Sequence, residues 1–182
     1  MAGVKSRHST DWTVADVYAV PDDGNRYEVI DGELLVTTPP DERHQVRAFD
    51  LARVLHAACP PDLLVYAGPI AVDVGDDRHL EPDLAVKARK AFRDSRAVPL
   101  LVVEVLSPST WRSDMRRKRA AYAQIAVPSY WLVDPLAPAV TVLQLRAGDY
   151  VETGVVGPGE ELAVQQPFPV RLAPGEWTAG LD

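Results

Sequence analysis

Two acidic residues occur in stretches of the sequence where a charge is unexpected. Glu104 lies in the aliphatic run LLVVEVL, residues 100–106, and Asp83 follows a proline in HLEPDLAVK, residues 79–87. An aliphatic run of this length is typical of a strand that is buried on both faces. An unpaired carboxylate in such a strand costs several kcal/mol, so Glu104 requires a cationic partner, a proton or a metal ion.

The position of Asp83 indicates what that partner is. Strand alternation places Asp83 and Glu81 on one face and Leu84 on the other, and Pro82 keeps the chain extended before it. If the two runs are neighbours in a sheet, Asp83 and Glu104 face each other, and two such carboxylates repel unless a cation lies between them. Oxygen ligands of this kind suit Mg²⁺ or Mn²⁺. We therefore predict that Asp83 and Glu104 are metal ligands.

A basic helix is expected after the Ser-Pro-Ser break at 107–109, with Ser113 as its N-cap. Lys118 lies three residues after Met115 and four before Tyr122, so it shares the apolar face that should be buried. The other charges of the helix are expected to face solvent or phosphate.

An ammonium on this inner face requires a carboxylate, and both Asp114 and Glu104 are candidates. Alternatively, Lys118 extends past Tyr122 to solvent. An Asp, a Glu and a Lys around one metal ion are the equipment for hydrolysing a phosphodiester. The metal ion activates water, while the ammonium stabilises the attacking hydroxide and the developing charge.

Composition places the chain among globular proteins. Its 182 residues, 47% hydrophobic and 25% charged, predict one domain over 1–182, with 1–10 flexible and 151–182 wrapping the edge of a sheet. The sequence lacks a run long enough to span a membrane and lacks a signal-like start, so we expect a cytoplasmic location. With one cysteine, Cys59, an internal disulfide and a cysteine-rich zinc site are excluded.

The charge distribution bears on nucleic-acid binding. A net charge of −7 argues against non-specific coating of nucleic acid, which draws on many basic contacts to phosphate. Five basic residues nevertheless fall within 112–119. This cluster is either a solvated helix face or the place where a nucleic-acid backbone lies.

The remaining elements predict an α+β fold with a central mixed β-sheet flanked by helices. A short N-terminal helix capped by Thr10 or Thr13 precedes an Asp31-Gly32 hairpin, and a helix over 41–59 follows. The runs 63–68, 70–74 and 79–87 are most simply a meander of antiparallel strands, with 100–106 as the fourth.

Two acids and one histidine are placed by these elements. The hairpin register pairs Glu28 with Leu35 and Ile30 with Glu33, so Glu28 and Glu33 share one face. His44, in the first turn of the helix over 41–59, is expected to be structural or solvent-facing, with the alternative that it reaches the site.

Several motifs occur in an order that resembles a known family: RYEVIDGELL, EPDLAV, LVVEVLSPST, the Asp114, Lys118 and Tyr122 spacing, and VPSYWLVDP. Over roughly residues 11 to 150 the chain resembles the PD-(D/E)XK nuclease superfamily and, within it, the bacterial restriction-endonuclease-like, Uma-type family. The resemblance implies a restriction-endonuclease-like core.

The resemblance also implies roles for individual residues. Asp83 and Glu104 match the metal ligands, and Glu28 matches an additional acid near the site. Leu106 stands where the superfamily normally has its lysine, and Lys118 matches a lysine that has moved to the following helix.

We therefore expect an endonuclease that depends on Mg²⁺ or Mn²⁺ and acts on DNA, with Lys118 assisting the attacking water. The alternative is a catalytically inactive module of the same fold that binds nucleic acid or protein, as the acidic net charge and Leu106 suggest. A homodimer is expected by analogy, because cutting two strands often uses two sites.

Overall fold

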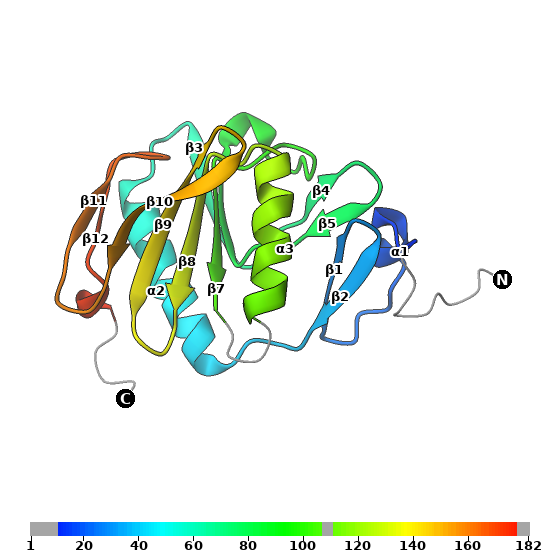
Figure 1. Ribbon diagram of the computed structural model, residues 1–182, viewed down its shortest axis with the longest axis horizontal. Helices are drawn as coiled ribbons and strands as arrows, with labels where there is room; N and C mark the ends of the chain where they lie inside the picture. The colour runs from blue at the N-terminus through cyan, green and yellow to red at the C-terminus, as the bar shows by residue number, and fades with distance from the viewer. Residues whose placement is uncertain (1–10, 107–110, 178–182) are drawn as a thin grey trace.

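The computed structural model describes residues 11–106 and 111–177, and its centre is a six-stranded mixed sheet in the order β10-β9-β8-β7-β6-β3 (Figure 1). Neighbouring strands are antiparallel except β7 and β8, which are parallel and are connected through a helix. This confirms the predicted central mixed sheet. The strands are β3 (Leu63–Ala67), β6 (Leu84–Ala88), β7 (Leu101–Val105), β8 (Ser129–Asp134), β9 (Ala139–Arg146) and β10 (Asp149–Val156).

Two helices, α2 (Glu42–Ala58) and α3 (Trp111–Gln124), pack on opposite faces of this sheet (Figure 1). Side chains of β7 alternate between the two faces: Val103 packs in a core cluster with Leu55 of α2, and Val102 packs in a second cluster with Tyr122 of α3. Because Glu104 follows Val103 by one residue, its side chain is directed to the α3 side of the sheet.

A second sheet, in the order β2-β1-β5-β4, lies at one end of the molecule beside α3 and next to the short helix α1 (Val14–Tyr18) (Figure 1). Its strands are β1 (Arg26–Ile30), β2 (Glu33–Thr37), β4 (Val72–Val74) and β5 (Arg78–Leu80). The predicted hairpin register is confirmed, since Glu28 pairs with Leu35. Asp31 and Gly32 form the turn with φ values of 52° and 79°, as a two-residue turn of this kind requires.

The predicted meander is wrong, because its strands belong to different sheets. Strand β3 pairs with β6, whereas β4 pairs with β5 in the second sheet. The run 79–87 is divided at Glu81 and Pro82, since proline has no N–H with which to continue a ladder. The division leaves Asp83 directly before β6, at the junction of the two sheets.

Side-chain caps define the starts of two helices. Thr13 caps α1 in a capping box with Asp16, and Asp41 caps α2 by accepting from the His44 N–H. Helix α3 begins at Trp111, so the prediction of Ser113 as its N-cap is wrong. Trp111 and Arg112 are compatible with a helix, so α3 already includes them and Ser113 lies inside the helix. The predicted break at 107–109 and the predicted flexible segment 1–10 lie outside the described residues.

The C-terminal part contributes a two-stranded ribbon, β11 (Leu162–Val164) and β12 (Val170–Leu172), beside β10 and α2 (Figure 1). Phe168, Leu172 and Trp177 belong to the same buried cluster as the apolar face of α2. The ribbon thus completes the core on that face. In the part of the chain that the structure describes, no helix is long and apolar enough to cross a membrane.

Candidate active site

Asp83 and Glu104 meet on neighbouring strands, as the sequence predicts. Leu84 of β6 pairs with Val103 of β7, so the antiparallel register brings Asp83 opposite Glu104. The Val105 N–H donates to Asp83 Oδ2 at 2.8 Å. Each carboxylate is only 5% exposed, which makes this a buried acidic pair at one end of β6 and β7.

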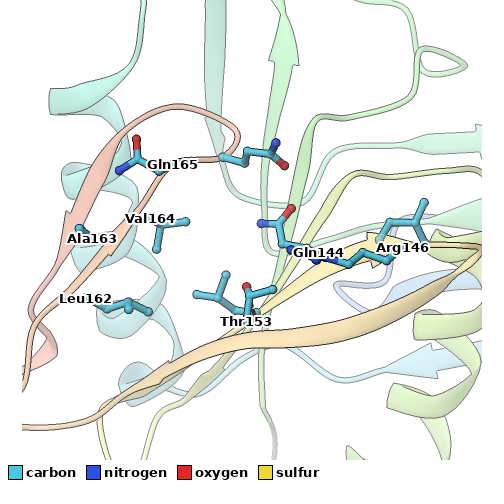
Figure 2. Close-up of a pocket in the computed structure, with 10 residues that line it drawn as sticks. Gln144, Arg146, Thr153, Leu162, Ala163, Val164 and Gln165 are labelled. Carbon is cyan, nitrogen blue, oxygen red and sulfur yellow. Dashed lines mark hydrogen bonds between the residues drawn. The ribbon is translucent and has the colours of Figure 1, made fainter.

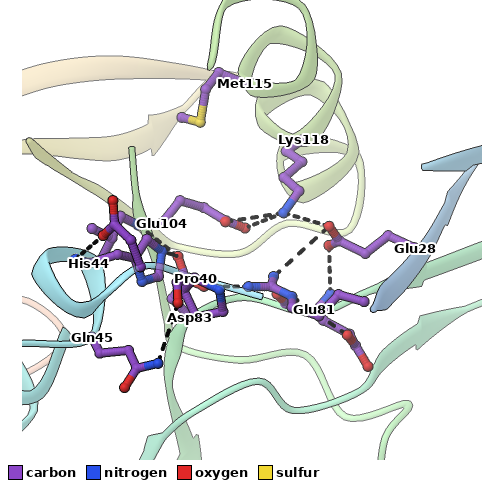
Figure 3. Close-up of polar contacts among 12 residues, drawn as sticks. Glu28, Pro40, His44, Gln45, Glu81, Asp83, Glu104, Met115 and Lys118 are labelled. Atoms are coloured by element: carbon purple, nitrogen blue, oxygen red, sulfur yellow. Dashed lines mark hydrogen bonds and ion pairs between the residues drawn. The ribbon is translucent and has the colours of Figure 1, made fainter. Parts of the chain in front are cut away.

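Lys118 lies between Glu104 and a second carboxylate from the N-terminal sheet (Figure 3). Its Nζ is 3.1 Å from Glu104 Oε2 and 2.8 Å from Glu28 Oε2. Tyr122, one turn further along α3, donates its hydroxyl to Glu104 Oε1 at 2.8 Å. Of the possibilities left open by the sequence, the Lys118 ammonium therefore pairs with Glu104 and does not extend to solvent. The side chain of Asp114 lies outside the described part of the chain.

Glu28 reaches this cluster from β1. Its side chain is 1% exposed and accepts from the Glu81 N–H at 2.8 Å, so Glu28 is held between Lys118 and the chain just before Asp83. Glu33 shares its face of the hairpin but stays at the surface, where it pairs with Arg117 at 2.5 Å. Of these two hairpin acids, Glu28 is the one that belongs to the cluster.

Arg26 is a member of the cluster that we did not single out from the sequence. Its Nη1 donates to Asp83 Oδ1 at 2.6 Å, its Nη2 donates to the Glu81 carbonyl, and Nη2 lies 4.0 Å from Glu28 Oε2. A signal was available, because residues two apart on a strand share a face and Arg26 is two residues before Glu28.

His44 also reaches the cluster, which is the alternative that the sequence left open. Its Nε2 is 3.1 Å from Asp83 Oδ2 (Figure 3). An ionised carboxylate can only accept, so Nε2 donates. The N-cap at Asp41 places this first turn of α2, and the packing of α2 on the sheet then directs the imidazole to the start of β6.

These environments separate the pKa values of the two strand carboxylates. Burial raises the pKa of Asp83, but the hydrogen bond from His44 and the charge of Arg26 outweigh it and lower the pKa to about 2. For Glu104, burial outweighs the attraction of Lys118 and raises the pKa to about 7. Such divergence between neighbouring carboxylates is common at functional sites.

The charge of Lys118 is also secured by its neighbours. Burial alone lowers the pKa of an ammonium, but the carboxylates of Glu104 and Glu28 outweigh burial and raise the pKa of Lys118. The lysine is therefore protonated at neutral pH, and it acts as a hydrogen-bond donor and a positive charge.

The carboxylates are ligands of the type that a hard divalent cation takes, but Arg26 and Lys118 compete with it for Asp83 and Glu104. Three carboxylates, Asp83, Glu104 and Glu28, face two cations, Arg26 and Lys118, which leaves negative charge in the cluster. Mg²⁺ keeps several waters and needs only one or two carboxylates, so Asp83 and Glu104 suffice. Arg26 now holds Asp83 Oδ1, and it would have to release that oxygen. Within 11–106 and 111–177, no group of three His, Cys, Asp or Glu residues could hold a metal ion.

A cavity of about 450 Å³ lies away from this cluster, between β9–β10 and the C-terminal ribbon (Figure 2). Its described lining includes Gln144, Arg146 and Thr153 from β9 and β10, and Gln165 beyond β11, but no carboxylate and no imidazole. The groups suited to acid–base or metal chemistry therefore lie at the β6–β7 cluster instead.

A mixed sheet with helices on both faces and a buried Asp, Glu and Lys at the end of two adjacent strands define a restriction-endonuclease-like protein. Residues 14–175 match the Uma2 family, whose description is "Putative restriction endonuclease", and the chain belongs to this family. The resemblance stated from the motifs is thereby confirmed, and a nuclease-like function is the coarse assignment that follows.

A solved structure has a similar fold, a "putative nuclease belonging to DUF820" from Anabaena variabilis. The TM-score is 0.67 at 17% sequence identity, and the alignment covers 85% of this chain and 89% of that chain. At this identity the similarity shows the fold. The comparison with curated proteins found no match.

Proposed function

We propose that this protein is a divalent-metal-dependent endonuclease that hydrolyses DNA phosphodiester bonds. The observation that carries the proposal is the convergence of Asp83, Glu104 and Lys118 in one buried cluster, with Nζ of Lys118 3.1 Å from Glu104. Membership of a family described as restriction endonucleases supports it.

In this proposal Asp83 and Glu104 hold Mg²⁺ or Mn²⁺. Such an ion lowers the pKa of bound water and neutralises charge on the phosphate. Lys118, protonated because Glu104 and Glu28 raise its pKa, orients the attacking water and stabilises the developing negative charge, but does not serve as a base. Glu28 positions Lys118 through the 2.8 Å contact.

The basic face of α3 is the proposed path of the DNA backbone. Arg117 is exposed and Arg119 is partly exposed, and their partners Glu33 and Asp149 are surface acids that phosphate oxygens can replace. Cutting both strands of a duplex would use two such sites, so we include a homodimer in the proposal. Sedimentation velocity of the purified protein with and without DNA checks this.

Plasmid nicking tests the proposal. Supercoiled plasmid with Mg²⁺ or Mn²⁺ should be converted to open circles by the wild-type protein and not by Glu104→Gln, which keeps the shape of the side chain but removes a ligand charge. Glu161→Gln is the matched control, because Glu161 is an exposed acid that pairs with Arg171 away from the cluster and from α3, and this variant should nick normally. Equal nicking by wild type and Glu104→Gln would contradict the assignment of Glu104 to the catalytic site.

A specific observation favours a second candidate function, a metal-independent DNA-binding module. Asp83 and Glu104 are already paired with Arg26 and Lys118, so the cluster is held together without a metal ion. Calorimetric titration with Mn²⁺ separates the candidates. An absence of Mn²⁺ binding, together with intact DNA binding, favours the module, whereas Mn²⁺ binding that is lost in Glu104→Gln favours the nuclease.

A further inference from the structure

A cavity of about 400 Å³ opens directly beside the carboxylate cluster. Arg26, His44 and Asp83 line it, and these three side chains are also members of the cluster. The cavity is therefore continuous with the proposed site, on the side of Asp83 that faces α2. It is separate from the cavity of Figure 2, whose described lining shares no residue with it.

Apart from Gln45, the rest of the described cavity wall is apolar, and it includes one phenylalanine ring and three prolines. Phe49 of α2 lines it, together with Pro39 and Pro40 from the connection before α2 and Pro69 from the loop after β3. Phe49 is 62% exposed, an unusual position for a large aromatic residue beside buried charges. Covering the ring with a ligand would remove this apolar surface from water, which favours binding.

Two features indicate space and an available polar atom in this cavity. A Cβ placed on Gly24 or Gly68, which both line it, would meet nothing within 4 Å. His44 Nδ1 is buried and has no hydrogen-bond partner among the described residues. Because Nε2 is engaged with Asp83, Nδ1 is the ring atom of His44 that remains available to a polar group of a ligand.

We infer that this cavity binds one unstacked nucleobase of the DNA strand, next to the phosphate that a metal ion at Asp83 and Glu104 would bind. The inference rests on the proposed function and names its substrate as single-stranded or locally unpaired DNA. The volume is in the range of small-ligand sites. A base inside a duplex is covered on both faces by its neighbours, so it can reach Phe49 only after it leaves the stack.

Binding of fluorescein-labelled oligonucleotides, measured by anisotropy with Ca²⁺ in place of Mg²⁺, tests the inference. Phe49→Ala should weaken binding of a single strand by about 5- to 150-fold, the effect of losing one stacked base. Phe49→Trp should retain binding. Phe92→Ala is the matched control, because Phe92 is 59% exposed and lies outside this cavity, and this variant should match the wild type.

A scan with one abasic nucleotide at each position of the strand locates the base in question. At one position the abasic substitution should weaken binding to the wild-type protein. The same substitution should not weaken binding to Phe49→Ala any further, because the base and the Phe49 ring form a single interaction. If the wild type cleaves DNA but Phe49→Ala binds the single strand as tightly as Phe92→Ala does, the cavity assignment is overturned and the proposed function stands. A wild-type protein that neither binds nor cleaves DNA overturns the proposed function as well.

Discussion

The ammonium of Lys118 is 7% exposed and is paired with two carboxylates from different elements, Glu28 and Glu104. Removing the cation would break the buried ion pairs with both Glu28 and Glu104 and leave Arg26, 4.0 Å from Glu28, as the nearby positive charge. We therefore expect Lys118→Met to lower the free energy of unfolding by about 3–5 kcal/mol. Urea denaturation followed by circular dichroism measures this. Arg117→Met, which removes an exposed ion pair on the same helix, should change stability by less than about 1 kcal/mol.

Arg26 leads to a prediction about metal affinity, because its guanidinium holds Oδ1 of Asp83, a proposed metal ligand. Replacing Arg26 by Gln removes a charge-assisted hydrogen bond worth about 1.5–3 kcal/mol. Mn²⁺ should then bind about 10- to 100-fold more tightly, as measured by isothermal titration calorimetry. Arg78→Gln is the control, since Arg78 pairs with Asp31 away from the cluster. Unchanged or weaker Mn²⁺ binding to Arg26→Gln would contradict the assigned competition.

At the scale of elements, the β4–β5 hairpin contains a buried histidine that couples stability to pH. His79 is 2% exposed, its Nδ1 is 2.6 Å from Asp73 Oδ1, and its Nε2 is 3.5 Å from Glu81. Tyr18 of α1 packs edge-on against the imidazole. Burial alone lowers the pKa of His79, but the hydrogen bonds to Glu81 and Asp73 outweigh burial and raise it.

The raised pKa sets the direction of the pH effect. Below the unfolded-state pKa near 6.5, His79 is protonated in both the folded and the unfolded protein, and its contribution to the free energy of unfolding is complete. As pH rises through the folded-state pKa, that stabilisation is lost. The free energy of unfolding should therefore fall from pH 6.5 upward, and less so in His79→Gln. Urea denaturation from pH 6 to 9 checks this, and His56→Gln, an exposed position on α2, should behave like the wild type.

On the scale of the whole molecule, the C-terminal ribbon and the central sheet share one buried cluster. Leu172 of β12 is fully buried in it, among residues of α2, β7 and β8. Leu172→Ala should lower the free energy of unfolding by about 2–5 kcal/mol, because it leaves a cavity in this core. Leu136→Ala, at a side chain that is 61% exposed, should have little effect.

Such shared packing is also the basis for proposing that 1–182 is one domain. We expect tryptophan fluorescence and far-ultraviolet circular dichroism to report a single coincident transition, and expect Leu172→Ala to shift both equally. Separate transitions, or a shift in one signal alone, would indicate that the ribbon folds as an independent unit.

Local patterns in the sequence were sufficient to predict several parts of the site. Asp31-Gly32 determines a tight turn, and the turn determines the register that places Glu28 and Glu33 on one face of the hairpin. Helical spacing places Lys118 on the buried face of α3. Each of these follows from the backbone period of one element or one hairpin, which neighbouring residues control.

The tertiary structure alone decided which distant segments meet. The division of 79–87 between two sheets and the convergence of Arg26 and His44 on Asp83 join residues far apart in the chain. No local period specifies such contacts, because they depend on how β1, α2 and β6 pack against one another. The sequence by itself therefore determined that Glu104 needs a partner, a proton or a metal ion, and the packing of α3 against β1 and β7 decided that Lys118 is its partner, shared with Glu28.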